Sequence, residues 1–305
     1  MAGSLQGTIV KGIAGFYYVL AGEGESRTLY ECKARGIFRL DGVTPLAGDR
    51  VTISLQEDGT GSIDEILPRV NVFDRPPVAN VETMVLVAAS KEPEPNFPLL
   101  DRFCVMAEQK NCRIAVCVNK ADIGDPAVLQ RFRNVYGPVY PVFIVSTVTG
   151  EGFEELRAFL KGTQAALAGP SGVGKSSIAN VLLDFEASET GEISRKTLRG
   201  KNTTRHTELF DAGEFRLFDT PGFTSFELGE VEEAQLQHFF PEFAPYLGKC
   251  RFDNCRHLEE PGCAVAKAAA EKTDQPEALR VLPGHDEDPA ADGKGKILRR
   301  RPWPI

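Results

Sequence analysis

The chain has 305 residues, of which 42% are hydrophobic and 26% are charged, and its formal net charge at pH 7 is −8. This composition is ordinary for a globular protein, and the length predicts two or three domains. Because the chain is acidic, any contact with RNA would need a local basic patch. No apolar run is long enough to cross a bilayer and no secretory signal is evident, so we expect a cytoplasmic protein.

Residues 1–70 are predicted to form a small all-β barrel of the OB type, because short β-rich runs alternate with glycine turns. The aromatic and basic residues of this module could stack on bases and contact phosphates, or they could fill the barrel and its solvated surface. These residues are Phe16, Tyr17, Tyr18, Lys33, Arg35 and Arg39. The predicted strands lie at 7–10, 15–20, 28–32, 36–40, 49–54 and 61–66.

Residues 71–228 are predicted to form a central α/β domain, and an extended linker at 69–77 leads into it and overlaps its first residues. Pro76 and Pro77 disfavour a helix in this linker. Predicted strands alternate with a predicted amphipathic helix, which indicates a mostly parallel sheet. The strands are 81–89, 112–118 and 140–145, and the helix is 99–109.

A polar N-K-x-D tetrapeptide follows the predicted strand 112–118. Ligands of parallel sheets bind beyond the carboxyl ends of the strands, where this tetrapeptide lies. The Asp122 carboxylate could accept hydrogen bonds from guanine N1–H and the 2-amino group, whereas adenine would leave it unpaired. Lys120 would lie along the base plane, and Asn119 would tie this loop to a phosphate-binding loop. By itself the tetrapeptide could also be an ordinary turn.

The sequence S-T-V-T-G at 146–150 follows the next predicted strand. It resembles an S-A-x-T-G element, in which a backbone N–H contacts guanine O6. We therefore place Ser146 and Thr147 in the same nucleotide site, with a helix N-cap as the alternative role.

A glycine-rich loop at 169–176 fits the pattern G-x-x-x-x-G-K-[ST]. Small apolar residues at 165–168 precede it, and apolar residues at helical spacing follow it, so the loop joins a strand to a helix. The N–H groups of such a loop face nucleotide phosphates, Lys175 would reach the β- and γ-phosphates, and Ser176 would ligate Mg²⁺. The expected residues are Gly169, Pro170, Ser171, Gly172, Val173, Gly174, Lys175, Ser176 and Ser177.

Two segments after the glycine loop are suited to the γ-phosphate. A predicted strand at 216–218 leads into D-T-P-G at 219–222, where Asp219 would join the Mg²⁺ shell and Gly222 would offer its N–H to the phosphate. The polar loop at 200–206 contains two threonines, and Thr204, with Thr203 as the alternative, would close over Mg²⁺. Alone, that loop could equally be a solvated surface loop.

Residues 229–283 are predicted to form a helical metal-binding domain, with helices at 232–240 and 264–271, and residues 284–305 are predicted to be disordered. Three thiolates and an imidazole at close spacing make a closed tetrahedral Zn²⁺ site of the structural type. Without an export signal, this cluster indicates a metal rather than disulfides, and unrelated buried cysteines are the alternative. The ligands are Cys250, Cys255, His257 and Cys263, in the spacing C-x₄-C-x-H-x₅-C.

The order of these motifs resembles a circularly permuted GTPase, because the guanine-specific elements precede the phosphate loop and D-T-P-G comes last. Together with R-P-P-V-A-N-V at 75–81, G-P-S-G-V-G-K-S-S at 169–177 and the Cys/His cluster, the chain resembles the ribosome small subunit-dependent GTPase A family over about residues 1–280. The resemblance implies hydrolysis of GTP to GDP and phosphate in late maturation of the 30S subunit, binding to 16S rRNA, and zinc at the same four positions. We expect a monomer with no membrane partner.

The permuted order runs D-T-P-G straight into the C-terminal module, so a switch that depends on the γ-phosphate could pull directly on that module. Many GTPases place glutamine after D-x-x-G to orient the attacking water, but this chain has Phe223. Members of the resembled family carry histidine in a stretch like G-K-H-T-T-R-H, where this chain has Asn202. Asparagine can hold a water but cannot take its proton near neutral pH.

Three functions therefore remain open. The first is a GTPase with Lys175, Asn202 and Thr204 as its catalytic residues, slow alone and faster on the ribosome. The second is a GTP-gated RNA-binding factor whose hydrolysis is vestigial. The third is an ATPase, which Asp122 disfavours.

Replacing Asn202 with histidine should raise the rate of GTP hydrolysis, because histidine can both hold the attacking water and accept its proton. Single-turnover hydrolysis of GTP by the wild type and by Asn202→His measures the effect. An unchanged rate would show that residue 202 does not position the water.

Overall fold

The computed structural model describes residues 4–22, 24–40, 42–184, 207–219, 232, 234–258 and 260–271. Residues Asn202, Thr204 and Gly222 and the segment 284–305 lie outside the described residues. The chain divides into two compact units, one formed by 1–85, 153–168 and 175–224 and the other by 86–152, 169–174 and 225–305. None of the helices in the described ranges has the length and apolar character needed to span a bilayer.

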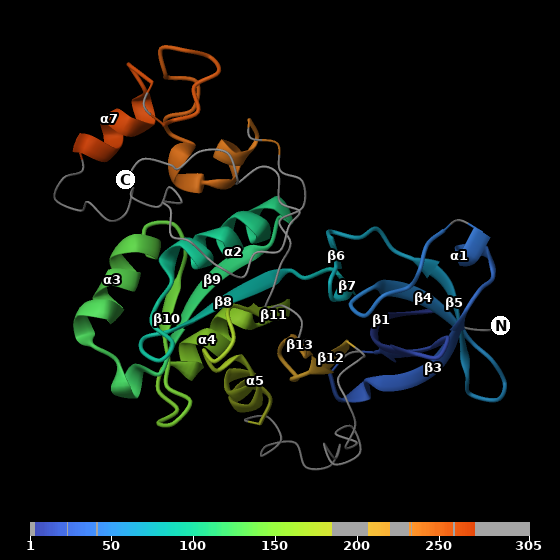
Figure 1. Ribbon diagram of the computed structural model, residues 1–305. Helices are drawn as coiled ribbons and strands as arrows, with labels where there is room; N and C mark the ends of the chain where they lie inside the picture. The colour runs from blue at the N-terminus through green and yellow to red at the C-terminus, as the bar shows by residue number, and fades with distance from the viewer. Residues whose placement is uncertain are drawn as a thin grey trace. The chain divides into compact units, whose positions relative to one another are not determined.

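The first unit contains a closed five-stranded barrel (Figure 1). The barrel closes because the long first strand pairs with two neighbours, β2 and β4, and the ring is completed through β3 and β5. Its interior holds Ile9, Val19, Ile53 and Ile63, none of which is exposed. The predicted barrel is confirmed. The strands are β1 (Ser4–Ile13), β2 (Phe16–Ala21), β3 (Thr28–Ala34), β4 (Arg50–Leu55) and β5 (Gly61–Ile66).

One predicted barrel strand is wrong. Residues 36–40 were predicted to be extended, but Ile37–Leu40 form a short helix, α1, and a short 3₁₀ turn, η1 (Gly24–Ser26), lies between β2 and β3. The reason is tertiary: β3 pairs in parallel with β5, so the barrel is already complete and the intervening chain must cross from one strand to the next. Ile37 and Leu40, which supplied the apolar signal for a strand, are 55% and 87% exposed.

The linker is extended, as predicted, but it folds back on itself. Strands β6 (Val72–Asp74) and β7 (Pro77–Ala79) form a two-stranded antiparallel ribbon. The buried side chain of Asn71 continues this pairing beyond the strands, because it donates to the carbonyl of Val81 at 2.8 Å and accepts from the N–H of Val81 at 2.9 Å. An amide side chain can replace a missing ladder bond in this way because it carries both a donor and an acceptor.

The first unit also holds three strands of the α/β sheet, β11 (Gln164–Ala168), β12 (Glu208–Asp211) and β13 (Arg216–Asp219). Strand β11 runs parallel to β13, β13 forms an antiparallel hairpin with β12, and β12 pairs with barrel strand β1. Helices α4 (Phe153–Leu160) and α5 (Lys175–Asp184) bury apolar side chains, and Arg157 of α4 donates to the carbonyl of Val181 in α5 at 2.7 Å.

The second unit contains the predicted strands of the α/β domain. Every residue of β8 (Thr83–Ala89) is buried, and this strand begins in the first unit and ends in the second. Continuous apolar runs of this kind are expected where helices cover both faces of a sheet. Strand β9 (Arg113–Asn119) lies next to β8, and β10 (Val142–Ile144) runs parallel to β9 on its other side. The helical segments are α2 (Phe97–Gln109), η2 (Ala121–Ile123) and α3 (Pro126–Tyr136).

The C-terminal part of the second unit is less helical than predicted. Helix α7 (Ala264–Glu271) is confirmed, but the described residues of the predicted helix 232–240 form only a 3₁₀ turn, η4 (Leu236–Phe239), followed by η5 (Pro241–Phe243). Phe240 takes an extended backbone, as residues before proline prefer, and its ring stacks on Phe243 at 5.1 Å. Phe240 and Phe243 belong to an apolar cluster that also includes Val105 of α2, so this part of the chain packs against the α/β domain.

Candidate nucleotide and metal sites

Three loops of the second unit meet at the buried side chain of Asn119, which is 1% exposed. Asn119 lies at the end of β9, and its Nδ2 donates to the carbonyl of Val173 in the glycine loop at 3.0 Å. Its Oδ1 accepts from the N–H of Thr147 at 3.4 Å. The contact between Asn119 and the glycine loop is the one that the sequence predicted, and the same side chain also reaches the loop after β10.

Glycine is required at both ends of the loop 169–174. Gly174 has a φ of 97°, and a Cβ there would lie 2.2 Å from Nδ2 of Asn119. Gly169 has a φ of 145°, and a Cβ there would lie 2.2 Å from the carbonyl oxygen of Val87 in β8. The glycines at the two ends of the motif are therefore explained by close approaches that leave no room for a Cβ.

The Asp122 side chain is oriented by Ser146. Asp122 is exposed, and its Oδ1 accepts a hydrogen bond from Ser146 Oγ at 2.6 Å. The Ser146 hydroxyl is itself held, because it accepts from the N–H groups of Val148 and Thr149 at 3.2 Å each. The sequence placed Ser146 in the site as a possible nucleotide contact, whereas the structure shows its buried hydroxyl aligning the carboxylate.

A fourth loop, residues 90–93 after β8, was missed by the sequence analysis. Ser90 Oγ donates to the carbonyl of Lys120 at 2.7 Å, and Lys120 Nζ donates to the carbonyl of Glu92. Lys120 has a left-handed backbone with a φ of 64°, a strained conformation for a side chain of its size. The one feature of the sequence that could have indicated this loop is its position after the carboxyl end of a buried strand, where ligands of parallel sheets bind.

The remaining described residues predicted to bind phosphate or Mg²⁺ lie at the start of helix α5 and at the end of β13. Burial lowers the pKa of the half-buried Lys175, as expected for an ammonium group removed from water. Ser176 and Ser177 are exposed in the first turn of α5. Asp219 ends β13, and β13 runs parallel to β11, so both strands deliver their carboxyl ends to the same edge of the first unit's sheet.

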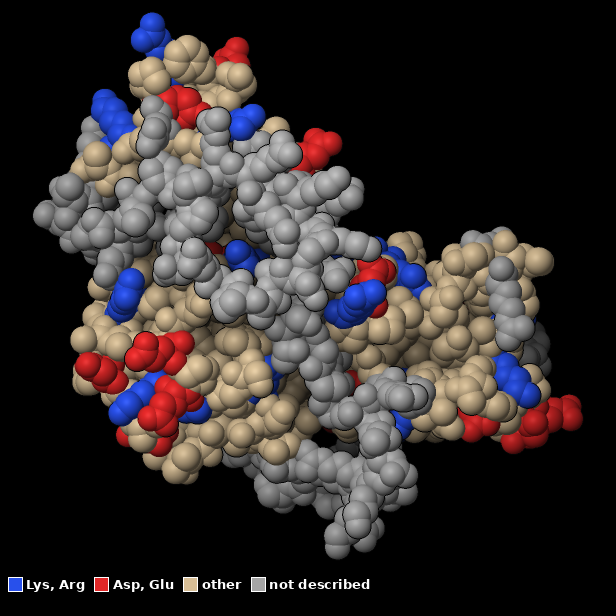
Figure 2. Space-filling view, in the orientation of Figure 1, with Lys and Arg blue, Asp and Glu red and all other residues tan. Residues whose placement is uncertain are grey.

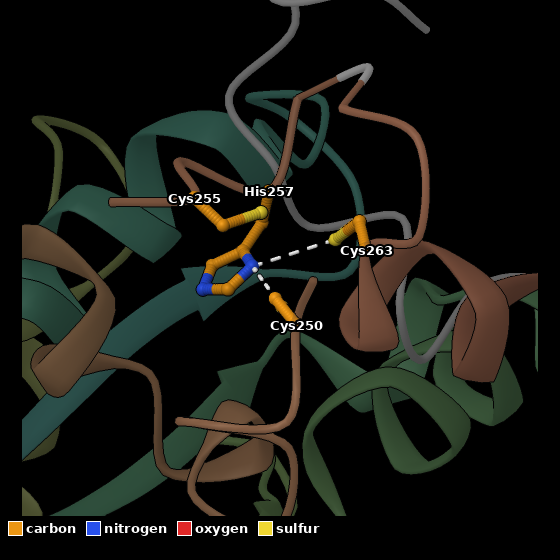
Figure 3. Close-up of side chains that lie close together, drawn as sticks. All are labelled: Cys250, Cys255, His257 and Cys263. Atoms are coloured by element: carbon orange, nitrogen blue, oxygen red, sulfur yellow. Dashed lines mark hydrogen bonds between the residues drawn. The ribbon is translucent and has the colours of Figure 1, made fainter. Parts of the chain in front are cut away.

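The four predicted metal ligands lie together (Figure 3). The ligand atoms of Cys250, Cys255, His257 and Cys263 are all within 4.8 Å of one another. Nδ1 of His257 lies 3.6 Å from Cys250 Sγ and 3.4 Å from Cys263 Sγ. Three thiol sulfurs around one ring nitrogen, three of the four residues being buried, fit a closed tetrahedral ion such as Zn²⁺.

Neighbouring residues orient the His257 ring and donate hydrogen bonds to two of the cysteine sulfurs. Nε2 of His257 lies 2.8 Å from Oε1 of Gln237, a contact that assigns the ring proton to Nε2 and leaves the Nδ1 lone pair for the metal. Burial lowers the pKa of His257, which favours the neutral imidazole that binds metals. The N–H groups of Ala264 and Ala266, in the first turn of α7, donate to the sulfurs of Cys250 and Cys263 at 3.3 Å each.

Comparisons with known proteins agree with this arrangement. A family model described as RsgA GTPase matches residues 66–229, and one described as RsgA N-terminal domain matches residues 6–63. A relative named small ribosomal subunit biogenesis GTPase RsgA, from Ruminiclostridium cellulolyticum, is 46% identical over 267 residues, which cover 86% of each chain. The protein of the same name from Agathobacter rectalis is 44% identical over 278 residues, covering 88% of this chain and 92% of the relative.

Two solved structures are also similar. YjeQ from Thermotoga maritima aligns with a TM-score of 0.75 at 33% identity, covering 89% of this chain and 92% of that one. YloQ, described as a circularly permuted GTPase, aligns with a TM-score of 0.76 at 31% identity, covering 91% and 93%. The fold and the order of the site loops thus define a circularly permuted GTPase. The chain belongs to the RsgA GTPase family.

Removing the side chain of Gln237 should weaken zinc binding about 10- to 100-fold, because His257 would lose the partner that orients its ring. Competition with a chromophoric chelator, using Gln237→Ala and wild type, measures the affinity. Gln235→Ala is the matched control, since Gln235 is exposed and makes no capping bond with its side chain. Equal affinities for all three proteins would contradict the proposed role of Gln237.

Proposed function

We propose that this chain hydrolyses GTP to GDP and phosphate in late maturation of the 30S ribosomal subunit, in the cytoplasm and as a monomer. The observation that carries the proposal is the junction at Asn119, which joins the glycine loop to the two loops expected to read guanine. The names of the relatives, which describe biogenesis of the small ribosomal subunit, support the setting.

Base selection is proposed to rest on Asp122. Its carboxylate projects at the surface and is aligned by the Ser146 hydroxyl. Guanine offers two adjacent N–H donors to such a carboxylate, whereas adenine offers neither in that arrangement and would leave a charged group unpaired. Lys120 would cover one face of the base, and the loop that contains Thr147 would lie at its O6 edge.

Catalysis is proposed to be mainly positioning and charge neutralisation. The N–H groups of residues 169–174 and the α5 N-terminus would hold the phosphates, with Lys175 over the β- and γ-phosphates. Ser176, Asp219 and Thr204 would hold Mg²⁺, which when bound neutralises charge on the phosphates. Gly222 would bind the γ-phosphate through its N–H, and Asn202 would hold the attacking water.

The flanking modules are proposed to contact ribosomal RNA. The domain boundaries would be 1–70 for the barrel, 71–228 for the GTPase, 229–283 for the zinc module and 284–305 for the tail. The zinc would be structural, because all four ligand positions come from the chain.

On the barrel, the structure separates the aromatic candidates. The Lys33 ammonium lies 5.0 Å from the centre of the Phe16 ring, a pair suited to stacking on a base beside a phosphate. Tyr17 instead packs against the barrel core, and the Tyr18 hydroxyl donates to Glu31 at 3.1 Å. Acidic and basic side chains are interspersed on the face drawn in Figure 2, so an RNA contact would be local.

The second candidate is a GTP-gated RNA-binding factor with vestigial hydrolysis, which Asn202 favours because it cannot act as a base. Single-turnover GTP hydrolysis with and without purified 30S subunits separates the two. We expect slow hydrolysis alone and faster hydrolysis with 30S. A rate that does not respond to 30S, in protein that still binds the subunit, would favour the binding factor.

Asp122→Asn should shift preference from GTP toward XTP, because an amide can donate to the 2-oxo group of xanthine. We expect at least a tenfold loss of GTP affinity, in line with the removal of a charged hydrogen-bond acceptor. Titration of fluorescent GTP and XTP analogues gives the two affinities, and Asp125→Asn, at the helix cap a few residues further on, is the control. Retained selectivity for GTP would contradict the assignment of Asp122.

A further inference from the structure

The barrel is joined directly to the strand that follows the polar switch loop. Strand β12 lies beside the barrel (Figure 1). It pairs with barrel strand β1, with Lys11 opposite Glu208. Lys11 Nζ donates to Glu208 Oε2 at 3.0 Å, and the two side chains are only 21% and 16% exposed. Partial burial makes this ion pair stronger and less screened by salt than a pair at an open surface.

The barrel also holds the turn between β12 and β13. Arg27, which lies between η1 and β3, donates through Nη1 to Asp211 Oδ2 at 2.5 Å. Its Nη2 donates to the carbonyl of Gly213 at 2.9 Å. One guanidinium group thus binds a carboxylate at the end of β12 and a backbone carbonyl in the turn, a fork that fixes orientation as well as distance.

Strand β13 is fixed to the barrel as well. Arg216 Nη1 donates to the hydroxyl of Thr8 in β1 at 3.2 Å. Gly48, just before β4, lies so close to β13 that a Cβ there would be 2.7 Å from the Phe218 ring. The same Cβ would also lie 2.0 Å from the carbonyl oxygen of Ala79 in β7. The hairpin is therefore held by the barrel at both of its strands and at its turn.

Two of these contact residues lie close in the chain to the residues proposed to bind Mg²⁺. Glu208 is four residues after Thr204, and Phe218 is the residue before Asp219. Thr204 and Asp219 are the residues proposed to hold Mg²⁺ beside the γ-phosphate. Both segments that respond to the γ-phosphate thus connect to strands that the barrel holds.

We propose that this seam, made by Lys11, Arg27 and Gly48 against the β12–β13 hairpin, transmits binding of ribosomal RNA on the barrel to GTP hydrolysis. The inference rests on the proposed function, and it makes Lys11 and Arg27 positioning residues for the stimulated reaction. A barrel held on the ribosome restrains β12 and β13, and this restraint lowers the entropic cost of aligning the residues beside the γ-phosphate. The coupling is reciprocal, so GTP also strengthens binding of the barrel to RNA.

A charge-swap cycle across the seam tests the proposal. Lys11→Glu and Glu208→Lys are made singly and together, and single-turnover hydrolysis of GTP is measured alone and with saturating 30S subunits. The control is Lys161→Glu, which changes net charge equally. Lys161, directly after α4, donates to Glu214 in the same hairpin turn but belongs to the GTPase side of it.

Each single swap is expected to reduce the stimulation by 30S about fivefold or more, the range of typical coupling between sites, while basal hydrolysis and GTP affinity stay near wild type. The melting temperature should fall in each single swap, because two like charges then face each other at a partly buried pair, and it should recover in the double swap. The double swap should restore stimulation, and Lys161→Glu should retain it. Rescue by the double swap separates positioning from a general loss of charge or of fold.

Arg27→Gln provides a second, independent variant, with the same loss of stimulation expected. Stimulation equal to wild type in both Lys11→Glu and Arg27→Gln would overturn the seam as the route of coupling. A double swap that folds, binds 30S and remains unstimulated would also overturn it. A wild-type protein that binds 30S without stimulation would overturn the proposed function itself, and the seam with it.

Discussion

The arrangement of the loops in the candidate nucleotide site depends on one buried side-chain amide. Asn119 uses its donor on Val173 and its acceptor on Thr147, so a single residue fixes the distance between the glycine loop and the loop after β10. If either hydrogen bond were broken, a buried polar group would be left unpaired, at a free-energy cost comparable to that of a hydrogen bond. Each of the two contacts therefore depends on the other. Gly174 belongs to the same arrangement, since a side chain there would occupy the place of the Asn119 amide. The Asp122 side chain, by contrast, is exposed, and a hydrogen bond from the Ser146 hydroxyl orients its carboxylate.

The metal cluster uses the same principle of short loops held by side chains. Phe243 packs edge-on against the His257 ring at 5.6 Å, while Gln237 holds the far nitrogen of that ring. Phe243, Cys255 and Cys263 also belong to an apolar cluster that includes Val105 of helix α2. Because metal binding in such small modules contributes directly to folding, the ion would stabilise not only its own loops but also their packing on the GTPase helix.

The permuted order gives the two segments proposed to bind the γ-phosphate different neighbours. The segment after D-T-P-G continues into the C-terminal module, whereas the strand before it and the strand after the polar loop are seated on the barrel. In the first unit this seating consists of strand pairing, a forked arginine contact and a glycine that allows close approach. Rigid contacts of this kind can carry a two-state change between sites, which flexible linkers cannot.

The sequence by itself determined the class of fold, the order of the motifs and the four Cys/His residues that lie together as a candidate metal site. Buried parallel strands such as β8 leave a continuous apolar signal, and phosphate and metal sites need fixed residue types at fixed spacing. Local pattern misled at 36–40 and 232–240, where apolar residues matched a strand and a helix. There the closure of the barrel through β3 and β5, and the stacking of Phe240 on Phe243, decided the conformation.

Only the tertiary structure revealed which residues act on the motifs from outside. Ser90 and Glu92 hold Lys120, Gln237 holds His257, and Arg27 holds the β12–β13 turn. Each of these contacts joins positions far apart in the chain, and none requires a residue type that is unusual for a surface loop. The physical reason is that a hydrogen bond or ion pair depends on the distance between two groups in space, which the spacing of residues along one segment does not contain.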